Sequence, residues 1–160
     1  MAGKSYKGVQ RTMRLEVALD SFYSDIESLA EEVREIVDNA GDNLANTSRI
    51  QTFEATADTL ENLSRPTDPS LPEALKTMEI TVMEAMPRSR RQNISRAVRC
   101  ENATAYGRVA VDSVREWCDE VEQTDQSPGD DTLTELREWC DEIEDHLSEA
   151  ESAEFPGMYG

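Results

Sequence analysis

The most regular feature of the chain is a row of apolar residues from Leu15 to Ala40, spaced alternately four and three residues apart. This heptad pattern predicts one long amphipathic helix that packs against other helices. Tyr23, Ala30 and Val37 widen the apolar stripe, and a wide stripe favours a multi-helix bundle over an isolated two-stranded coiled coil. The residues expected to form this packing seam are Leu15, Leu19, Phe22, Ile26, Leu29, Val33 and Ile36.

Glycine and proline gather at a few places between long uninterrupted segments. Residues 9–40, 42–65, 73–86 and 130–155 contain neither, and residues 88–127 contain only Gly107. Because these two residues end or interrupt helices, the gaps predict five helices with four connections. We therefore expect an all-α fold, an elongated bundle of about five helices that ends in an antiparallel helical hairpin.

The same breaks suggest how the 160 residues are organised. A chain of this length suffices for one compact domain or one elongated assembly. Small residues around Gly107 would let a neighbouring helix approach closely, although this glycine could instead mark a bend. The expected segments are a flexible basic arm (1–8), a three-helix segment (9–87), a long helix with a basic start (88–125), an acidic helix that completes the hairpin (126–153) and a flexible tail (154–160).

A short internal repeat is the most specific motif. Residues 115–120 read Arg-Glu-Trp-Cys-Asp-Glu, and residues 137–142 repeat the same six letters. With the polar linker 123–131 between them, the two copies predict an antiparallel helical hairpin. Packing alone would preserve only the apolar positions, yet the exposed positions are identical too. Either a recent duplication has not diverged, or the match is a coincidence, or a partner contacts both copies equivalently.

Charge is arranged in blocks within a chain that has 34 acidic and 16 basic residues, a net charge of -18. Residues 1–14 contain four basic and no acidic residues, and residues 88–99 contain five basic and no acidic residues. The second block falls at an expected helix N-terminus, where the helix dipole disfavours cations. It therefore needs an anionic partner, which could be the acidic first or third helix, a second subunit, or a ligand such as nucleic acid. The candidate anion-binding residues are Arg88, Arg90, Arg91, Arg96 and Arg99.

The expected hairpin is strongly acidic. Residues 110–152 contain 16 acidic residues and 2 arginines. On a hairpin about 33 Å long this gives roughly one net charge per 2.4 Å, against one per roughly 1.7 Å in duplex DNA. Charge densities this close permit a DNA-mimic role, although a salt-adapted or GC-rich genome also produces acidic, lysine-poor chains. The candidate partner-binding residues are Glu116, Asp119, Glu120, Glu138, Asp141 and Glu142.

Signals of catalysis are sparse. The chain has no glycine-rich phosphate loop and no Ser-His-Asp arrangement, and its three cysteines form no CxxC pair. Glu31, Glu32 and Glu35 are similar in spacing to the magnesium-binding carboxylates of all-helical nucleotide pyrophosphohydrolases, but the heptad places them mostly away from the apolar seam. We therefore expect no metal site and no cofactor, and keep a metal-dependent pyrophosphohydrolase only as a minor alternative.

These patterns together favour a non-enzymatic protein-interaction module of prokaryotic or viral type. The leading version is an inhibitor or adaptor whose acidic hairpin binds a basic, nucleic-acid-binding surface of a partner protein. The alternative is a structural subunit that forms homo-oligomers through residues 15–40 and contacts nucleic acid or an acidic partner through the arginines of 88–99. No apolar run approaches the length of a membrane span or has the pattern of a signal peptide. The expected location is therefore the cytoplasm, which would be the host cytoplasm for a viral protein. We expect the cysteines to be reduced there.

Overall fold

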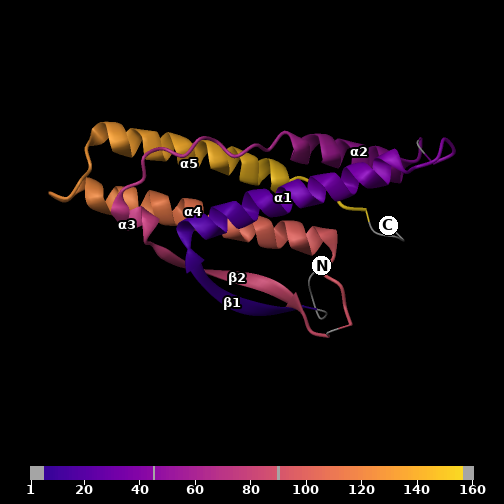
Figure 1. The fold of residues 1–160 in the computed structure, drawn as a ribbon, viewed down its shortest axis with the longest axis horizontal. Coiled ribbons are helices and arrows are strands. Elements are labelled where there is room, and N and C mark those ends of the chain that lie inside the picture. Colours follow the sequence, from indigo (N-terminus) through magenta and orange to yellow (C-terminus); the bar gives the residue numbers. More distant parts are fainter. Residues whose placement is uncertain (1–5, 45, 90, 157–160) are drawn as a thin grey trace.

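The computed structural model describes residues 6–44, 46–89 and 91–156, which form five helices and one two-stranded antiparallel sheet (Figure 1). The expectation of an all-α protein is therefore wrong, because the fold mixes helices with a sheet. In chain order the elements are β1 (Tyr6–Arg14), α1 (Leu15–Asp38), α2 (Ser48–Glu61), α3 (Glu73–Lys76), β2 (Glu79–Pro87), α4 (Arg96–Glu122) and α5 (Asp130–Glu151).

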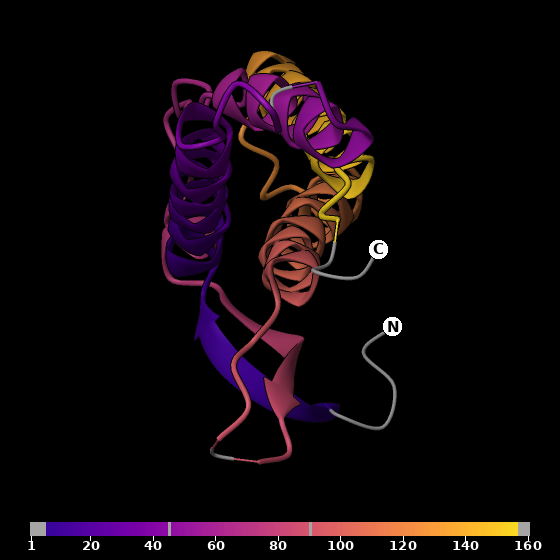
Figure 2. The ribbon, with the colours of Figure 1, turned by 90° about the vertical axis from the view of Figure 1, so that its right-hand side faces the viewer.

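The elements form three layers, which are clearest along the long axis of the molecule (Figure 2). Helices α1 and α4 lie side by side in the middle layer. On one side, α2 packs on α1 and α5 packs on α4, and on the opposite side lies the sheet, which contacts α4 through β2. Thr56 in α2 donates a hydrogen bond from Oγ1 to the carbonyl of Glu154, 2.7 Å away, and so ties α2 to the chain that follows α5.

The apolar row of α1 supplies much of the core between these layers. The first six members of the packing seam are at most 1% exposed, whereas Ile36 is half-buried. These side chains are covered by α2 and α4 of the same chain. The seam through which the sequence suggested an assembly is therefore used for packing within the chain.

Residues 73–86 were expected to form a helix, and this prediction is wrong. Only the four-residue α3 is helical, and β2 follows it. Ile80 and Val82 are buried while Thr81 and Met83 are exposed, which is the two-residue period of a strand. The β-branched run from Ile80 to Val82 favours this conformation.

The partner strand β1 lies where the sequence predicted a flexible arm and the start of the first helix. Tyr6 pairs with Pro87 at one end of the sheet and Arg14 pairs with Glu79 at the other. Helix α1 begins where this pairing ends, since the Leu15 amide still donates to the carbonyl of Met78 at 3.0 Å. The expected boundaries at residues 8 and 87 therefore fall inside the sheet, and residues 1–5 and 157–160 lie outside the described part of the chain.

Helix α4 starts at Arg96 rather than at residue 88. Ser95 caps it, accepting a hydrogen bond at Oγ from the Val98 amide at 3.2 Å. The residues before the cap are fastened to β1, because the Tyr6 hydroxyl accepts from the Ser95 amide and the Tyr6 carbonyl accepts from Nε of Arg88, both at 3.1 Å. The two basic blocks of the sequence therefore meet at one end of the sheet.

Gly107 lies where α4 passes close to both α1 and α5. A Cβ atom at this position would be 2.6 Å from Cδ2 of Leu147 and 3.1 Å from Cγ of Phe22. Distances this short leave no room for a side chain. Of the two roles that the sequence suggested for this glycine, the structure supports the close approach of neighbouring helices.

Asn102 attaches α4 to the sheet. Its side chain is buried, and its Oδ1 accepts from the Ala85 amide at 2.9 Å while its Nδ2 donates to the Ala85 carbonyl at 3.0 Å. The side-chain amide thus occupies the place that a neighbouring strand would take on this edge of β2.

Candidate functional site

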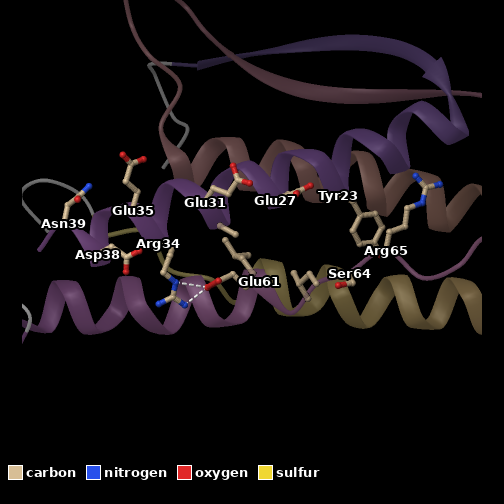
Figure 3. Close-up of a pocket in the computed structure, with 13 residues that line it drawn as sticks. Tyr23, Glu27, Glu31, Arg34, Glu35, Asp38, Asn39, Glu61, Ser64 and Arg65 are labelled. Atoms are coloured by element: carbon tan, nitrogen blue, oxygen red, sulfur yellow. Dashed lines mark hydrogen bonds and ion pairs between the residues drawn. The ribbon is translucent and has the colours of Figure 1, made fainter.

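A groove of about 870 Å³ lies between α1 and the chain from Leu60 to Arg65 (Figure 3). Its apolar lining comes from Tyr23, Ala30, Leu60 and Leu63, all of which are largely buried. These side chains also belong to the main core, so the bottom of the groove is a fixed surface. The groove therefore combines an opening with an apolar floor.

Four carboxylates follow one another along the α1 side of this groove. Glu27, Glu31 and Glu35 are spaced four residues apart and Asp38 follows, so they share one face of the helix over about 16 Å. All four are exposed, and none has an ion pair within residues 6–44, 46–89 and 91–156. We call these four residues the acidic row.

The two arginines that line the groove are already occupied. Arg34 donates from Nη2 to Asp58 at 2.6 Å and from Nε to Glu61 at 2.8 Å. Arg65 binds Asp20 and Asp68 in the same way, with 3.1 Å between its Nη2 and Oδ2 of Asp68. These pairs hold residues 60–65, the wall of the groove opposite α1, in place, and within the described part of the chain the acidic row has no counter-charge.

One end of the groove is closed by a contact between α1 and α5. The hydroxyl of Tyr23 lies 2.7 Å from Nδ1 of His146, and the two rings meet edge to face with centroids 5.8 Å apart. Burial raises the pKa of the Tyr23 phenol above its ordinary value of 10.0. The phenol therefore stays neutral at physiological pH.

The repeated motif forms reciprocal ion pairs across the α4–α5 hairpin. Arg115 in the first copy binds Asp141 in the second, with 2.7 Å between Nη2 and Oδ1. Arg137 in the second copy binds Asp119 in the first at 3.0 Å. The two copies are thus related by an approximate two-fold axis that makes each one the partner of the other.

The symmetry extends to the residues that follow each copy. Arg115 also binds Glu144 at 2.8 Å, and Arg137 binds Glu122 at 2.9 Å. Hydrogen bonds from these arginines lower the pKa of both glutamates. The identity of the arginine and aspartate positions therefore has a structural explanation within the chain, one that the sequence did not suggest.

The six candidate partner-binding carboxylates of the hairpin do not form one surface. Asp119 and Asp141 are paired internally, as described above. Glu116 and Glu120 are exposed on α4 beside the start of β2, whereas Glu142 on α5 lies close enough to Tyr23 of α1 to raise the pKa of its phenol. Glu138 is exposed on α5. The groove is therefore a better-formed binding site than the hairpin.

The arginines of residues 88–99 are also separated by the fold. Arg99 binds Glu32 of α1 through two hydrogen bonds, 2.9 and 2.5 Å long, and Nε of Arg96 lies 3.4 Å from the same carboxylate. The bonds from Arg99 lower the pKa of Glu32. Arg88 and Arg91 are exposed, and Arg90 lies outside the described residues. The acidic first helix, one of the partners that the sequence suggested, thus occupies Arg96 and Arg99.

The carboxylates considered for metal-dependent catalysis do not converge. Glu31 and Glu35 line the groove, while Glu32 points to Arg96 and Arg99 on another side of α1. In the described part of the chain, no three His, Cys, Asp or Glu side chains are placed to hold a metal ion. The cysteines are buried, and burial raises the pKa of Cys100 to about 11 and of Cys140 to about 12.

The acidic row was not recognised as a unit from the sequence. Glu27 was not selected, and Glu31 and Glu35 were considered only as metal ligands. Their four-residue spacing was visible, but the opposite wall of the groove comes from residues 60–65, whose position depends on the packing of α2 on α1.

No helix among the described residues has the length and apolar character needed to cross a membrane.

Comparison with known proteins adds no further constraint. No family model matches the chain, and neither a curated protein nor a solved structure matches it.

Proposed function

We propose that this protein is a non-enzymatic interaction module that binds a basic segment of a partner protein in the groove between α1 and α2. The observation that supports this most directly is the acidic row, four exposed carboxylates that form no ion pair with any described residue and lie beside an apolar floor. A row of like charges on one helix repels itself, and a cationic partner relieves that repulsion.

The geometry favours an amphipathic helix as the bound segment. Lysine or arginine side chains spaced four residues apart on such a helix match the spacing of Glu27, Glu31 and Glu35. Apolar side chains on its adjacent face would contact the exposed part of Leu63 on the floor, which is 7% exposed. If that helix normally contacts nucleic acid, its capture in the groove blocks that contact, and the protein acts as an inhibitor or adaptor.

The acidic hairpin contributes to this function at longer range. The chain has a net charge of -18, and the exposed glutamates on α4 and α5 add to a negative field around the molecule. Such a field accelerates encounters with a basic partner and is screened by salt. We therefore assign contact to the groove and steering to the hairpin.

A charge-matched pair of variants tests the assignment. The groove variant changes Glu27, Glu31 and Glu35 together to glutamine, and the control variant makes the same change at Glu116, Glu120 and Glu138 on the hairpin. The probe is a labelled helical peptide with lysine at every fourth position and leucine on the adjacent face, and its binding is measured by fluorescence anisotropy at low and high salt.

We expect the groove variant to bind the peptide at least about tenfold more weakly at low salt, because three ion pairs of about 0.5–1 kcal/mol each are lost. The control variant should lose much less affinity, since it reduces only the long-range field. Equal losses in both variants would show that net charge alone drives binding and that the groove is not the site. The absence of binding by the parent protein at low salt would also contradict the proposal.

A further inference from the structure

Strand β1 has an open edge. The side chain of Asn102 forms hydrogen bonds with both the main-chain amide and the main-chain carbonyl of Ala85, so these groups point away from β1. In an antiparallel sheet, two residues that lie opposite each other direct their main-chain groups either both toward each other or both outward. Gly8 lies opposite Ala85, so its main-chain groups also point outward, away from β2. The same alternation directs the amides and carbonyls of Gly8, Gln10 and Thr12 away from β2, and within the described residues no group accepts or donates a hydrogen bond to them.

The two edges of this sheet are therefore unlike. The outer edge of β2 is covered by α4 and Asn102, whereas six of the nine residues of β1 are exposed. Figure 2 shows β1 along the outside of the molecule, away from α4. A two-stranded sheet is marginal by itself, and further strands stabilise it. The open edge from Gly8 to Thr12 is a ready template for another strand.

We propose that two copies of the chain pair through β1 in antiparallel orientation, which gives a four-stranded sheet with the order β2-β1-β1-β2 around a two-fold axis at Gln10. This register is centred on β1 and uses the outward main-chain groups of Gly8, Gln10 and Thr12. It places Gln10 opposite Gln10 of the second copy, and Gly8 opposite Thr12 of the second copy, so that the outward-pointing main-chain groups of both strands bond to each other.

The side chains of β1 fit this register. Lys7 lies opposite Met13 of the second copy, and Arg11 lies opposite Val9 of the second copy, so no two like charges are directly opposed. Arg11 also keeps its own counter-ion, because its Nε lies 2.6 Å from Oε2 of Glu84 on β2. The basic residues of β1 therefore do not prevent pairing of the two copies.

An exposed methionine supports the same interface. Met83 is 55% exposed and lies against Gly8, where a Cβ atom would be only 2.9 Å from its Sδ. The missing side chain at Gly8 lets Met83 lie across β1. In the proposed register Thr12 of the second copy stands beside Gly8, so the added strand covers part of this apolar side chain.

Charge gives the dimer a distinctive dependence on salt. Each copy has a net charge of -18, so two copies repel each other at long range and salt screens that repulsion. A dimer held by main-chain hydrogen bonds and apolar contacts therefore tightens as salt rises. Binding of a basic segment in the groove has the opposite dependence, so the two proposals can be tested independently.

Sedimentation velocity of the full chain at about 0.1 and about 2 M NaCl tests the dimer. The decisive variant is Gln10→Pro, which removes an outward amide at the two-fold axis without removing a β1–β2 hydrogen bond. The matched control is Gln10→Thr, which keeps the amide and suits a strand. We expect the parent and Gln10→Thr to dimerise more tightly at high salt, and Gln10→Pro to dimerise at least tenfold more weakly, with unchanged circular dichroism.

A cross-linking experiment remains informative even if the proline variant does not fold. Gln10→Cys should form a disulfide-linked dimer under mild oxidation, whereas Thr81→Cys on β2 should not, because the native cysteines are buried and position 81 is far from the axis. A parent that stays monomeric at both salt concentrations, a dimer that survives Gln10→Pro, or equal cross-linking of the two cysteine variants would overturn the proposal. Binding of an acidic extended peptide to a monomeric parent would also overturn it, because β1 would then serve a different protein.

Discussion

Arg115 and Asp141 meet across the α4–α5 hairpin at 2.7 Å, and the equivalent pair Arg137 and Asp119 repeats the contact in the opposite direction at 3.0 Å. Two identical words in the sequence thus form a symmetric structure in which each supplies the counter-ion of the other. The arginine and the aspartate of each copy are constrained by this pairing, whereas Glu116, Glu120, Glu138 and Glu142 take part in no ion pair among the described residues.

The symmetry predicts equal energies for the two pairs. Double-mutant cycles with Arg115→Gln and Asp141→Asn, and with Arg137→Gln and Asp119→Asn, should each give a coupling energy of about 0.2–1 kcal/mol, because these pairs are exposed to solvent. The free energy of unfolding in urea measures both cycles. A clear coupling in one cycle and none in the other would contradict the reciprocal arrangement.

The variant Gly107→Ala should destabilise the protein although alanine favours helices. Helix propensity gains about 1 kcal/mol, but a methyl group at this position collides with Leu147 and Phe22 in a packed core, which costs roughly 1–3 kcal/mol. We expect a lower melting temperature with unchanged helical content. A rise in stability would show that Gly107 is not held close to its neighbours. In the background of Leu147→Ala, the substitution Gly107→Ala should cost less stability than in the parent, because the collision with Leu147 is gone.

The variant Asn102→Asp should loosen the sheet specifically. Aspartate keeps the size of the side chain but loses the Nδ2 donor and places a carboxylate oxygen against the Ala85 carbonyl. Leaving a buried acceptor unsatisfied costs about 1–3 kcal/mol. Hydrogen exchange of the Ala85 amide should accelerate, and the exposed position Asn93 provides a control with Asn93→Asp. Equal effects of the two substitutions would argue against the role assigned to Asn102.

Stability should fall at alkaline pH. Burial raises the pKa of Cys100 from 9.0 to about 11 and that of Tyr106 from 10.0 to about 12. The folded state therefore holds these protons more tightly than the unfolded state. The two groups contribute their full stabilisation at pH values below their unfolded pKa values, and this stabilisation is lost as the pH rises from the unfolded toward the folded pKa values. Thermal melts should show this decline, and Cys100→Ala should remove the part that begins near 9.0. A melting temperature that stays constant over this range would contradict the burial of these groups.

The helices and the sheet differ in how far the sequence specified them. The apolar row of α1 is a local pattern, and its packing could be inferred from spacing alone. Leu75, Met78 and Val82 also have helical spacing. Val82 nevertheless lies in β2, because it pairs with Arg11, a residue far away in the sequence. Periodicity within a short window does not contain that pairing.

The candidate site was only partly predictable for a similar reason. The blocks of charge could be counted from the sequence, but neutralisation depends on which helices pack together. Glu32 is paired because α4 brings Arg99 to it, whereas Glu31, one residue earlier, faces the groove and has no cationic partner among the described residues. Adjacent glutamates thus have different roles, and only the tertiary arrangement distinguishes them.

The long separation between the two strands also sets the order of folding. During synthesis β1 leaves the ribosome first, and it stays without a partner until β2 and then the α4 residue Asn102 have been made. Helices α1 and α2 form from local contacts in the meantime, whereas closing the sheet requires a distant encounter and is therefore the slow step.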